Sequence, residues 1–171
     1  MRDITNSLFT INTYGGSETK KTCYINGKKY MVKFPDPVRE NNKDISYVNN
    51  QYSEYISCKI FEQFGIDVQK TELVKCFIDG KEKIAVMCED FLNDDEMLIE
   101  FKTLSYSLST EIIYTNELSD IFDMVKELDT LTDKNEFEDK FWDIFIVDTL
   151  IGNVDRHLGN WGIVANLIHP N

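Results

Sequence analysis

The most informative segment of this 171-residue chain runs Asp148-Thr149-Leu150-Ile151-Gly152-Asn153-Val154-Asp155-Arg156-His157-Leu158-Gly159-Asn160-Trp161. It follows a run of apolar residues at helical spacing. Gly152 stands where that helix is expected to end, because glycine accepts the left-handed conformation found at helix ends. Asp155 and Asn160 then lie five residues apart. The segment therefore predicts a helix followed by a polar loop that presents a carboxylate and a carboxamide close together.

This loop has the residue types that phosphoryl transfer requires. A phosphotransferase needs a carboxylate to orient or deprotonate the attacking hydroxyl, and an oxygen ligand for the magnesium ion that bridges the phosphates. In protein kinases one short loop supplies both, as an Asp followed five residues later by an Asn. The alternative is a surface loop whose Asp and Asn cap local backbone groups. The spacing alone does not separate these two interpretations, so other parts of the chain must decide.

The composition excludes several classes of protein. Hydrophobic residues make up 42% of the chain and charged residues 28%, which is typical of a globular domain with a packed core. The net charge of −12 leaves no excess of Lys and Arg to neutralise duplex DNA. The N-terminus lacks the apolar segment of a signal peptide, and no apolar run approaches the length of a membrane span. We therefore expect a cytoplasmic protein that does not bind nucleic acid directly.

The cysteines show no pattern of pairing or of metal binding. They have no Cys-x-x-Cys spacing and no zinc-like spacing with the two histidines. In a cytosolic protein such thiols stay reduced. We expect four reduced, mostly buried thiols: Cys23, Cys58, Cys76 and Cys88.

The first half of the chain has the pattern of strands around one helix. Alternating apolar residues predict the strands, and Asn26-Gly27 is a strong hairpin signal between two of them. The helix is expected at residues 49–64. Its apolar face would consist of Tyr52, Ile56, Ile60 and Phe64, with Gly65 at the helix end. The expected strands are 8–14, 22–25, 29–34, 71–78 and 83–88.

The second half has the pattern of helices. Residues 117–128 and 135–150 carry apolar residues at helical spacing, and a short strand is expected at 161–164. The apolar face of the second helix would consist of Phe137, Phe141, Ile144 and Phe145, with Asp148 next along it.

The acidic segment 89–96 is the expected boundary between two lobes. The predicted fold class is α+β, with a mostly antiparallel sheet and one main helix in residues 1–92 and a partial helical lobe in residues 93–171. Clefts between two such lobes commonly hold ligands.

Lys33 and Glu54 form the second candidate site. In the predicted strand, period two places Met31 and Lys33 on one face and the apolar neighbours on the other. A lysine at the end of such a strand can reach ATP phosphates if a carboxylate holds it, and Glu54 in the following helix is the natural partner. Glu54 lies off the apolar face of that helix. The alternatives are a snorkelling lysine and a solvated glutamate.

Two further segments could contact a nucleotide. The backbone amides of Gly15-Gly16-Ser17 could cradle phosphates, although the stretch matches neither a P-loop nor a dinucleotide-binding motif, and a plain hairpin turn is the alternative. The segment 87–91 ends a strand and could present backbone groups to an adenine ring, which makes Glu89 and Phe91 candidate ATP contacts. A plain linker is the alternative there. His157 is expected to support the loop by hydrogen bonding rather than to bind metal.

In their order along the chain, these motifs resemble the HipA-like serine/threonine kinases, and most closely the forms with an Asp-Arg-His loop similar to that of phosphatidylinositol 3/4-kinases. The resemblance spans residues 14–164, and its last segment is the most specific. The matching segments are Tyr14-Gly15-Gly16-Ser17, Tyr30-Met31-Val32-Lys33-Phe34, Tyr52-Ser53-Glu54-Tyr55 and Asp148 to Trp161.

The resemblance implies a protein-kinase-like fold that uses ATP and Mg²⁺. Asp155 would be the catalytic base, Asn160 a magnesium ligand, and Lys33 a phosphate contact paired with Glu54. The resemblance also implies a protein substrate, and for a toxin of a toxin–antitoxin system an antitoxin partner. Gly15, Gly16 and Ser17 would cover the phosphates, with Ser17 a candidate autophosphorylation site. Loop support would come from Asp148, Arg156 and His157.

One feature of such kinases has no counterpart here. They place a second metal-binding Asp on a strand after the loop, whereas no Asp or Glu follows Asp155. We therefore expect a kinase that lacks its C-terminal part, a split kinase completed by another chain, or a non-catalytic pseudokinase that binds a nucleotide or a partner. An unrelated α+β domain with an incidental loop is a further alternative.

Overall fold

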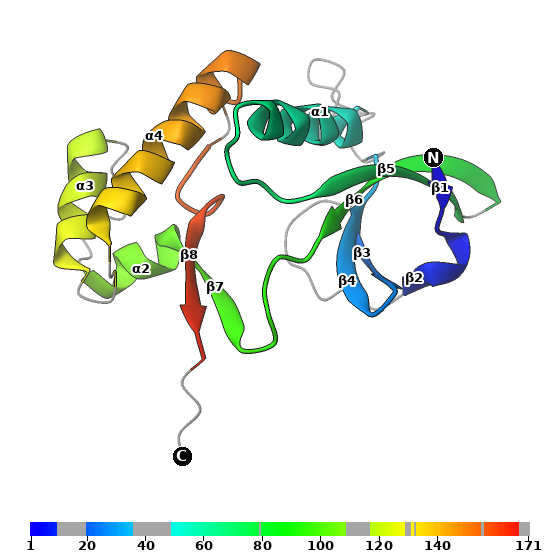
Figure 1. Cartoon of the computed structure of the whole chain (residues 1–171), viewed down its shortest axis with the longest axis horizontal. Coiled ribbons are helices and arrows are strands. Elements are labelled where there is room, and N and C mark those ends of the chain that lie inside the picture. Colours follow the sequence, from blue (N-terminus) through cyan, green and yellow to red (C-terminus); the bar gives the residue numbers. More distant parts are fainter. Residues whose placement is uncertain are drawn as a thin grey trace. The chain divides into compact units, whose positions relative to one another are not determined.

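The computed structural model describes residues 1–9, 20–35, 49–78, 80–108, 117–128, 131, 133–154 and 156–167. Four predicted site residues, Gly15, Gly16, Ser17 and Asp155, lie outside these ranges. The chain divides into two compact units, Met1–Phe91 and Leu92–Asn171, whereas the sequence predicts a boundary after residue 92. The predicted fold class is confirmed, since the chain has the mixed helix-and-sheet arrangement of a kinase (Figure 1).

The described part of the first unit contains a six-stranded sheet in the order β1-β5-β6-β4-β3-β2. Neighbouring strands run antiparallel, except that β1 is parallel to β5. The predicted hairpin is confirmed: β3 and β4 meet at Asn26 and Gly27, whose φ angles of 52° and 79° match the turn that joins twisted strands. The strands are β1 (Arg2–Asp3), β2 (Leu8–Phe9), β3 (Lys20–Ile25), β4 (Lys28–Lys33), β5 (Thr71–Ile78) and β6 (Lys81–Glu89). A short 3-10 helix, η1 (Thr5–Ser7), lies between β1 and β2.

The two faces of this sheet have different roles. Val32 pairs with Met87 across β4 and β6, and both belong to the main apolar core of the unit. The next pair along, Lys33 and Val86, projects from the opposite face because side chains alternate along a strand. Helix α1 (Asn50–Gln63) contacts β5 and β6 and covers that opposite face. Lys33 is thereby directed at α1.

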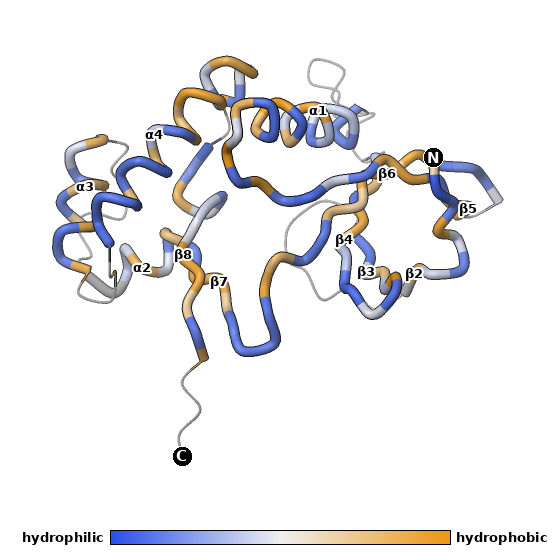
Figure 2. Tube along the Cα trace, in the orientation of Figure 1, coloured by the Kyte–Doolittle hydropathy of each residue, from blue (hydrophilic) through white to orange (hydrophobic). Residues whose placement is uncertain are grey.

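The predicted apolar face of α1 is wrong. Ile56 and Phe64 are 55% and 60% exposed, while the buried residues of the helix are Gln51, Cys58 and Phe61. Figure 2 shows hydrophobic and hydrophilic residues interleaved along α1, so its sequence does not select one face by hydropathy alone. The face that meets the sheet is the one that carries Glu54, because Glu54, Cys58 and Phe61 follow each other at helical spacing.

The second unit pairs β7 (Glu96–Glu100) with β8 (Gly162–Asn166) and adds three helices among its described residues. The predicted helices appear as α3 (Leu118–Glu127) and α4 (Lys134–Ile151), and the predicted final strand appears as β8. Two elements are not predicted from the sequence, β7 and α2 (Phe101–Leu108). Gly162 makes the β7–β8 pairing possible, because a Cβ atom there would collide with the Ile99 carbonyl.

The core of the second unit is rich in aromatic rings. Phe101 is 1% exposed and stacks on Trp161 with 4.3 Å between ring centroids, and Phe137 and Phe141 pack around them. The predicted apolar face of α4 is partly wrong, since Phe145 is 52% exposed. The ring stack joins the start of α2 to the residue just before β8, so it fixes the far end of the loop that follows α4.

Candidate functional site

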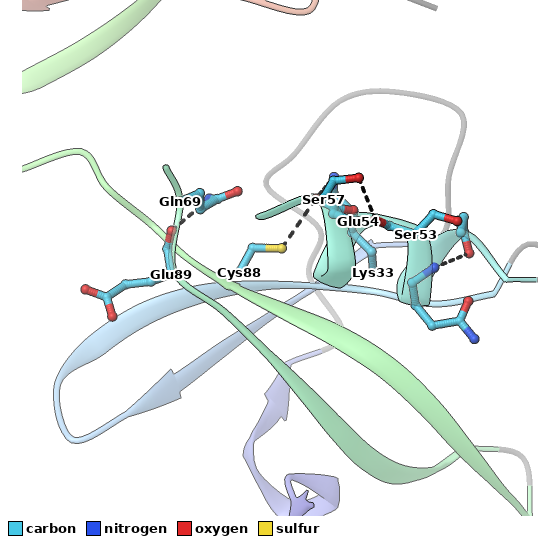
Figure 3. A network of polar contacts seen from close by, with 9 residues as sticks. Lys33, Ser53, Glu54, Ser57, Gln69, Cys88 and Glu89 are labelled. Carbon is cyan, nitrogen blue, oxygen red and sulfur yellow. Dashed lines mark hydrogen bonds and ion pairs between the residues drawn. The ribbon is translucent and has the colours of Figure 1, made fainter. Parts of the chain in front are cut away.

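In the first unit, Lys33 and Glu54 form an ion pair with 2.6 Å between Nζ and Oε1 (Figure 3). The lysine comes from the end of β4 and the glutamate from α1, so the pair links the helix to the sheet. The side chains are 18% and 26% exposed, which leaves them partly screened from water. The structure therefore brings together the two residues that the sequence predicts as partners.

Sequence reasoning missed a third member of this cluster, Cys88. Its Sγ donates to Glu54 Oε1 at 3.5 Å (Figure 3). Burial raises the pKa of the Cys88 thiol, with the Glu54 charge as the second cause, so the group stays protonated and acts as a donor. Only the register between β4 and β6 reveals its place, because Cys88 lies opposite Met31, which shares a face of the strand with Lys33.

The connector after β6 is held tightly within the first unit. The Glu89 N–H donates to the Lys70 carbonyl and the Asp90 N–H to the Lys29 carbonyl, each at 2.9 Å. The Glu89 carbonyl accepts from Gln69 Nε2 at 2.8 Å (Figure 3). These main-chain groups, proposed from the sequence as adenine contacts, therefore already have partners inside the unit.

The side chains of the connector differ from one another. The Glu89 carboxylate bonds Lys28 at 2.8 Å, and this hydrogen bond lowers the pKa of Glu89. Phe91, in contrast, is 53% exposed. Of the two candidate ATP contacts, Phe91 is therefore the one whose side chain is exposed and able to contact a ligand.

In the second unit, Asp148 is the centre of the polar contacts at the start of the loop. It is 7% exposed and receives two hydrogen bonds from one edge of Arg156, Nε to Oδ2 at 2.6 Å and Nη2 to Oδ1 at 2.9 Å. Asn153 Nδ2 adds a third, to Oδ1 at 2.9 Å. Asn153 was not among the predicted site residues, and no spacing rule points to it, because it follows a left-handed turn at Gly152 with φ 70°.

The far end of the loop holds Asn160 and His157. The Asn160 N–H donates to the His157 carbonyl at 2.9 Å, and the Asn160 carbonyl accepts from Arg156 Nη1 at 3.2 Å. The exposed His157 ring accepts from the Gly159 N–H at 3.1 Å. Asn160 itself is exposed. Asp155, the predicted catalytic base, lies outside the described residues.

A cavity of about 730 Å³ lies beside this loop within the second unit. Its apolar wall comes from α3 and α4, and its polar wall comes from the end of α4 and from the loop. Among the residues that the structure describes, no group of three or more His, Cys, Asp or Glu side chains could hold a metal ion. Representative lining residues are Leu118, Ile121, Phe141, Asp148, Asn153 and Arg156.

No helix in the described ranges has both the length and the apolar character required to cross a membrane. All four cysteines are free and buried, as the sequence predicts.

Comparison with known proteins identifies the family. The family described as HipA-like C-terminal domain matches residues 13–169. A serine/threonine-protein kinase CtkA of Helicobacter pylori is 35% identical over 154 residues, which are 88% of this chain and 46% of that protein. The crystal structure of a Helicobacter pylori proinflammatory kinase CtkA has a TM-score of 0.80 and 32% identity, covering 96% of this chain and 55% of that one. The chain thus spans about half the length of these relatives, and it belongs to the HipA-like family.

Proposed function

We propose that this chain carries the nucleotide-binding and catalytic-loop part of a HipA-like serine/threonine kinase, which transfers a phosphoryl group from ATP to a Ser or Thr hydroxyl. The observation that carries the proposal is the Lys33–Glu54 ion pair at 2.6 Å, because kinases require such a pair to hold a lysine on the nucleotide phosphates. The similarity to the kinase CtkA supports the same reading.

Each candidate residue has a role under this proposal. Asp155 accepts the proton of the attacking hydroxyl, and Asn160 offers its side-chain oxygen to the metal ion. Lys33 contacts the phosphates, which Gly15, Gly16 and Ser17 cover with their backbone amides. Phe91 packs against the adenine beside Glu89. Mg²⁺, when bound, neutralises the charge that develops on the phosphates.

Among residues 156–171, we propose one metal ligand, Asn160. Magnesium prefers carboxylate oxygens together with phosphate and water, and Asn160 supplies one neutral oxygen. Residues 156–171 contain no carboxylate. The loop after Asp155 and the residues that follow it therefore supply no carboxylate for the metal, and we propose that a complementing C-terminal segment supplies the second ligand.

The test measures binding and turnover separately. Calorimetry should detect ATP binding to the wild-type chain, and radiolabelled ATP should label a Ser or Thr, with Ser17→Ala removing any label on the proposed autophosphorylation site. Asp155→Ala should abolish transfer and leave ATP binding largely intact. If the wild type neither labels itself nor hydrolyses ATP above the Asp155→Ala background, active catalysis by this chain is wrong.

A second candidate function is a non-catalytic half of a split kinase that binds its complementing chain. The exposed apolar face of α4 and the following loop favours it, because large exposed apolar patches mark interaction sites. Its members are Phe145 (52% exposed), Ile146 (60%), Leu150 (61%) and Val154 (97%). The proposed occupant is a polypeptide segment equivalent to the part of CtkA that this chain does not match.

The second candidate is tested with that unmatched part of CtkA as the probe. Calorimetry should detect its binding to the wild-type chain, and the double change Ile146→Ser with Leu150→Ser should weaken binding at least tenfold. Tyr24→Ser, an exposed aromatic of the first unit, is the control. Nucleotide binding that leads to turnover only after the probe is added would favour a split kinase. If the double variant binds the probe as tightly as the wild type does, the α4 face is not the binding site.

We also propose that the chain acts as a toxin of a toxin–antitoxin system. A toxin role would make the chain inhibit growth when expressed alone, and co-expression of an antitoxin would relieve that effect. A cytoplasmic location fits four free thiols and a supply of ATP. Growth that is equal for wild type and Asp155→Ala would argue against a toxin that acts by phosphorylation.

A further inference from the structure

We propose that Asp148 is a positioning residue, whose carboxylate sets the place of Asn160 through Arg156. The expected effect of Asp148 on metal affinity rests on the proposed function. The expected effect of Asp148 on the conformation of the loop does not.

The first link is the bidentate contact between Asp148 and Arg156. Nε and Nη2 of the guanidinium donate to the two carboxylate oxygens at 2.6 and 2.9 Å, and the Asp148 side chain is 9% exposed. Such charge-assisted pairs fix orientation as well as distance, because the guanidinium is planar and its donors form a rigid fork. Asn153 Nδ2 shares Oδ1 at 2.9 Å, which restrains the carboxylate further.

The second link runs from Arg156 to Asn160. With one edge of the guanidinium held by Asp148, the remaining nitrogen, Nη1, has a fixed direction and donates to the Asn160 carbonyl at 3.2 Å. The Asn160 N–H in turn donates to the His157 carbonyl at 2.9 Å. The main chain of Asn160 is therefore held on both sides, and a buried carboxylate on α4 controls an exposed residue at the other end of the loop.

A simpler role for Asp148 would be to end the helix, but its main chain performs that role. The N–H groups of Gly152 and Asn153 both donate to the Asp148 backbone carbonyl. These bonds do not involve the side chain and should survive its replacement. Positioning and helix capping are therefore separable, because a change of side chain should loosen Asn160 and spare the amides of Gly152 and Asn153.

Amide hydrogen exchange of the whole chain tests the positioning role. Asp148→Asn keeps the size of the side chain and removes the charge, and Arg156→Lys keeps the charge and removes the bidentate contact. Both should speed exchange of the Asn160 amide roughly tenfold or more, the loss expected for a charge-assisted bond, and change the Gly152 and Asn153 amides by less than about twofold. Asp139→Asn, an exposed carboxylate on the same helix, is the control.

Two outcomes would overturn the positioning role. One is an Asn160 amide that exchanges as in the wild type. The other is equal acceleration of the amides of Asn160, Gly152 and Asn153, which would mean that Asp148 only stabilises the helix end.

The magnesium dependence of ATP binding tests the consequence for the site. Asp148→Asn should raise the Mg²⁺ concentration needed for half-maximal effect roughly tenfold and leave ATP binding in EDTA within about twofold. A wild type that binds no ATP with or without Mg²⁺ would remove the proposed function, while the exchange result would still decide the positioning role. A wild type with Mg²⁺-dependent binding that Asp148→Asn does not alter would remove the inference alone.

Discussion

The two units build their polar clusters in different ways. In the first unit, the paired residues Lys33 and Glu54 are 21 positions apart and belong to different elements. In the second, Asp148 and Arg156 are 8 positions apart and lie in one helix and its loop. The first cluster therefore depends on the packing of α1 against the sheet, whereas the second depends on local chain geometry. We expect the first to respond to any loss of tertiary structure in its unit and the second to be more resistant.

The apolar cores of the two units also differ in how they are built. The core of the first unit lies within a broad sheet, where Val32, Val74 and Cys76 are fully buried. The core of the second unit is centred on Phe101 and its stacked rings, and α4 leaves several large apolar side chains exposed. Both tryptophans, Trp142 and Trp161, belong to the second unit. Tryptophan fluorescence therefore reports on that unit alone, and circular dichroism reports on both.

The largest expected effect comes from truncating one core residue in each unit. Phe34→Ala and Phe101→Ala should each lower the free energy of unfolding of their own unit by about 3–5 kcal/mol, because each removes a ring that is 1–2% exposed. Urea unfolding should show Phe101→Ala shifting the fluorescence transition, and Phe34→Ala shifting the dichroism transition with little change in fluorescence. If Phe34→Ala shifts the fluorescence and dichroism transitions equally, the two units unfold together and do not differ in stability as proposed.

Alkaline pH should weaken the first unit selectively. All four cysteines lie in it, and burial raises the pKa of each above the ordinary value of 9.0. The unfolded chain therefore releases thiol protons that the folded unit retains, so stability is fully present below pH 9 and falls as pH rises above it. A thiol that stays protonated in the folded unit should cost on the order of 1 kcal/mol for each pH unit above that value.

Urea unfolding at pH 8 and pH 9.5 checks this expectation. The dichroism transition should move to lower urea at pH 9.5, and the fluorescence transition should move less. Replacing all four cysteines with Ala should remove most of the difference between the two probes. If the fluorescence transition moves as far as the dichroism transition, the thiols of the first unit are not the cause of the loss of stability at alkaline pH.

Breaking the helix-to-sheet ion pair should have a smaller effect on stability. Glu54→Gln leaves the partly buried Lys33 without a carboxylate, which should cost about 1–2 kcal/mol in the first unit and weaken ATP binding. Glu62→Gln breaks a pair with Lys59 that is more than a third exposed, and should cost less than about 0.5 kcal/mol. The difference between the dichroism midpoints of the two variants measures how much more the partly buried ion pair stabilises the unit than the exposed one. Equal midpoints would contradict the expectation that burial strengthens the Lys33–Glu54 pair.

The sequence predicted most of what depends on local chemistry. The Asn26-Gly27 hairpin and the ends of α1 and α4 at Gly65 and Gly152 follow from turn and helix-end residues whose conformations are restricted. The sequence also identified Lys33 and Glu54 as partners, because period two in a strand limits the directions of its side chains.

The sequence did not predict features that depend on distant partners. Strand β7 exists because Glu96–Glu100 pairs with β8, more than 60 residues later in the chain, and its own acidic ends do not indicate a strand. The buried face of α1 was missed because the sheet selects it through Glu54 and Phe61, whereas the more apolar stripe with Ile56 stays exposed. Cys88 was missed for the same reason, since its role comes from the register between β4 and β6.

The smallest expected difference between the two units lies at two helix ends that are alike in conformation. Gly65 after α1 and Gly152 after α4 have φ angles of 71° and 70°, and a Cβ atom at either position would meet nothing within 4 Å. Gly65→Ala and Gly152→Ala should therefore each cost only the backbone strain of a left-handed alanine, about 1 kcal/mol. The urea midpoint of Gly65→Ala, followed by circular dichroism, reports the loss of stability in the first unit. The urea midpoint of Gly152→Ala, followed by fluorescence, reports the loss in the second, and the two losses should be similar.

The two glycine variants should differ in their effect on the polar clusters. Gly65 lies beyond the helical turns that carry Glu54, so Gly65→Ala should leave the Lys33–Glu54 pair and ATP affinity unchanged. Gly152 separates Asp148 from Asn153 and Arg156, so Gly152→Ala should also speed exchange of the Asn160 amide, because the loop must reach back to a carboxylate one turn earlier. If Gly152→Ala costs the same stability without any change at Asn160, the loop is held mainly by the Phe101–Trp161 stack at its far end rather than by Asp148.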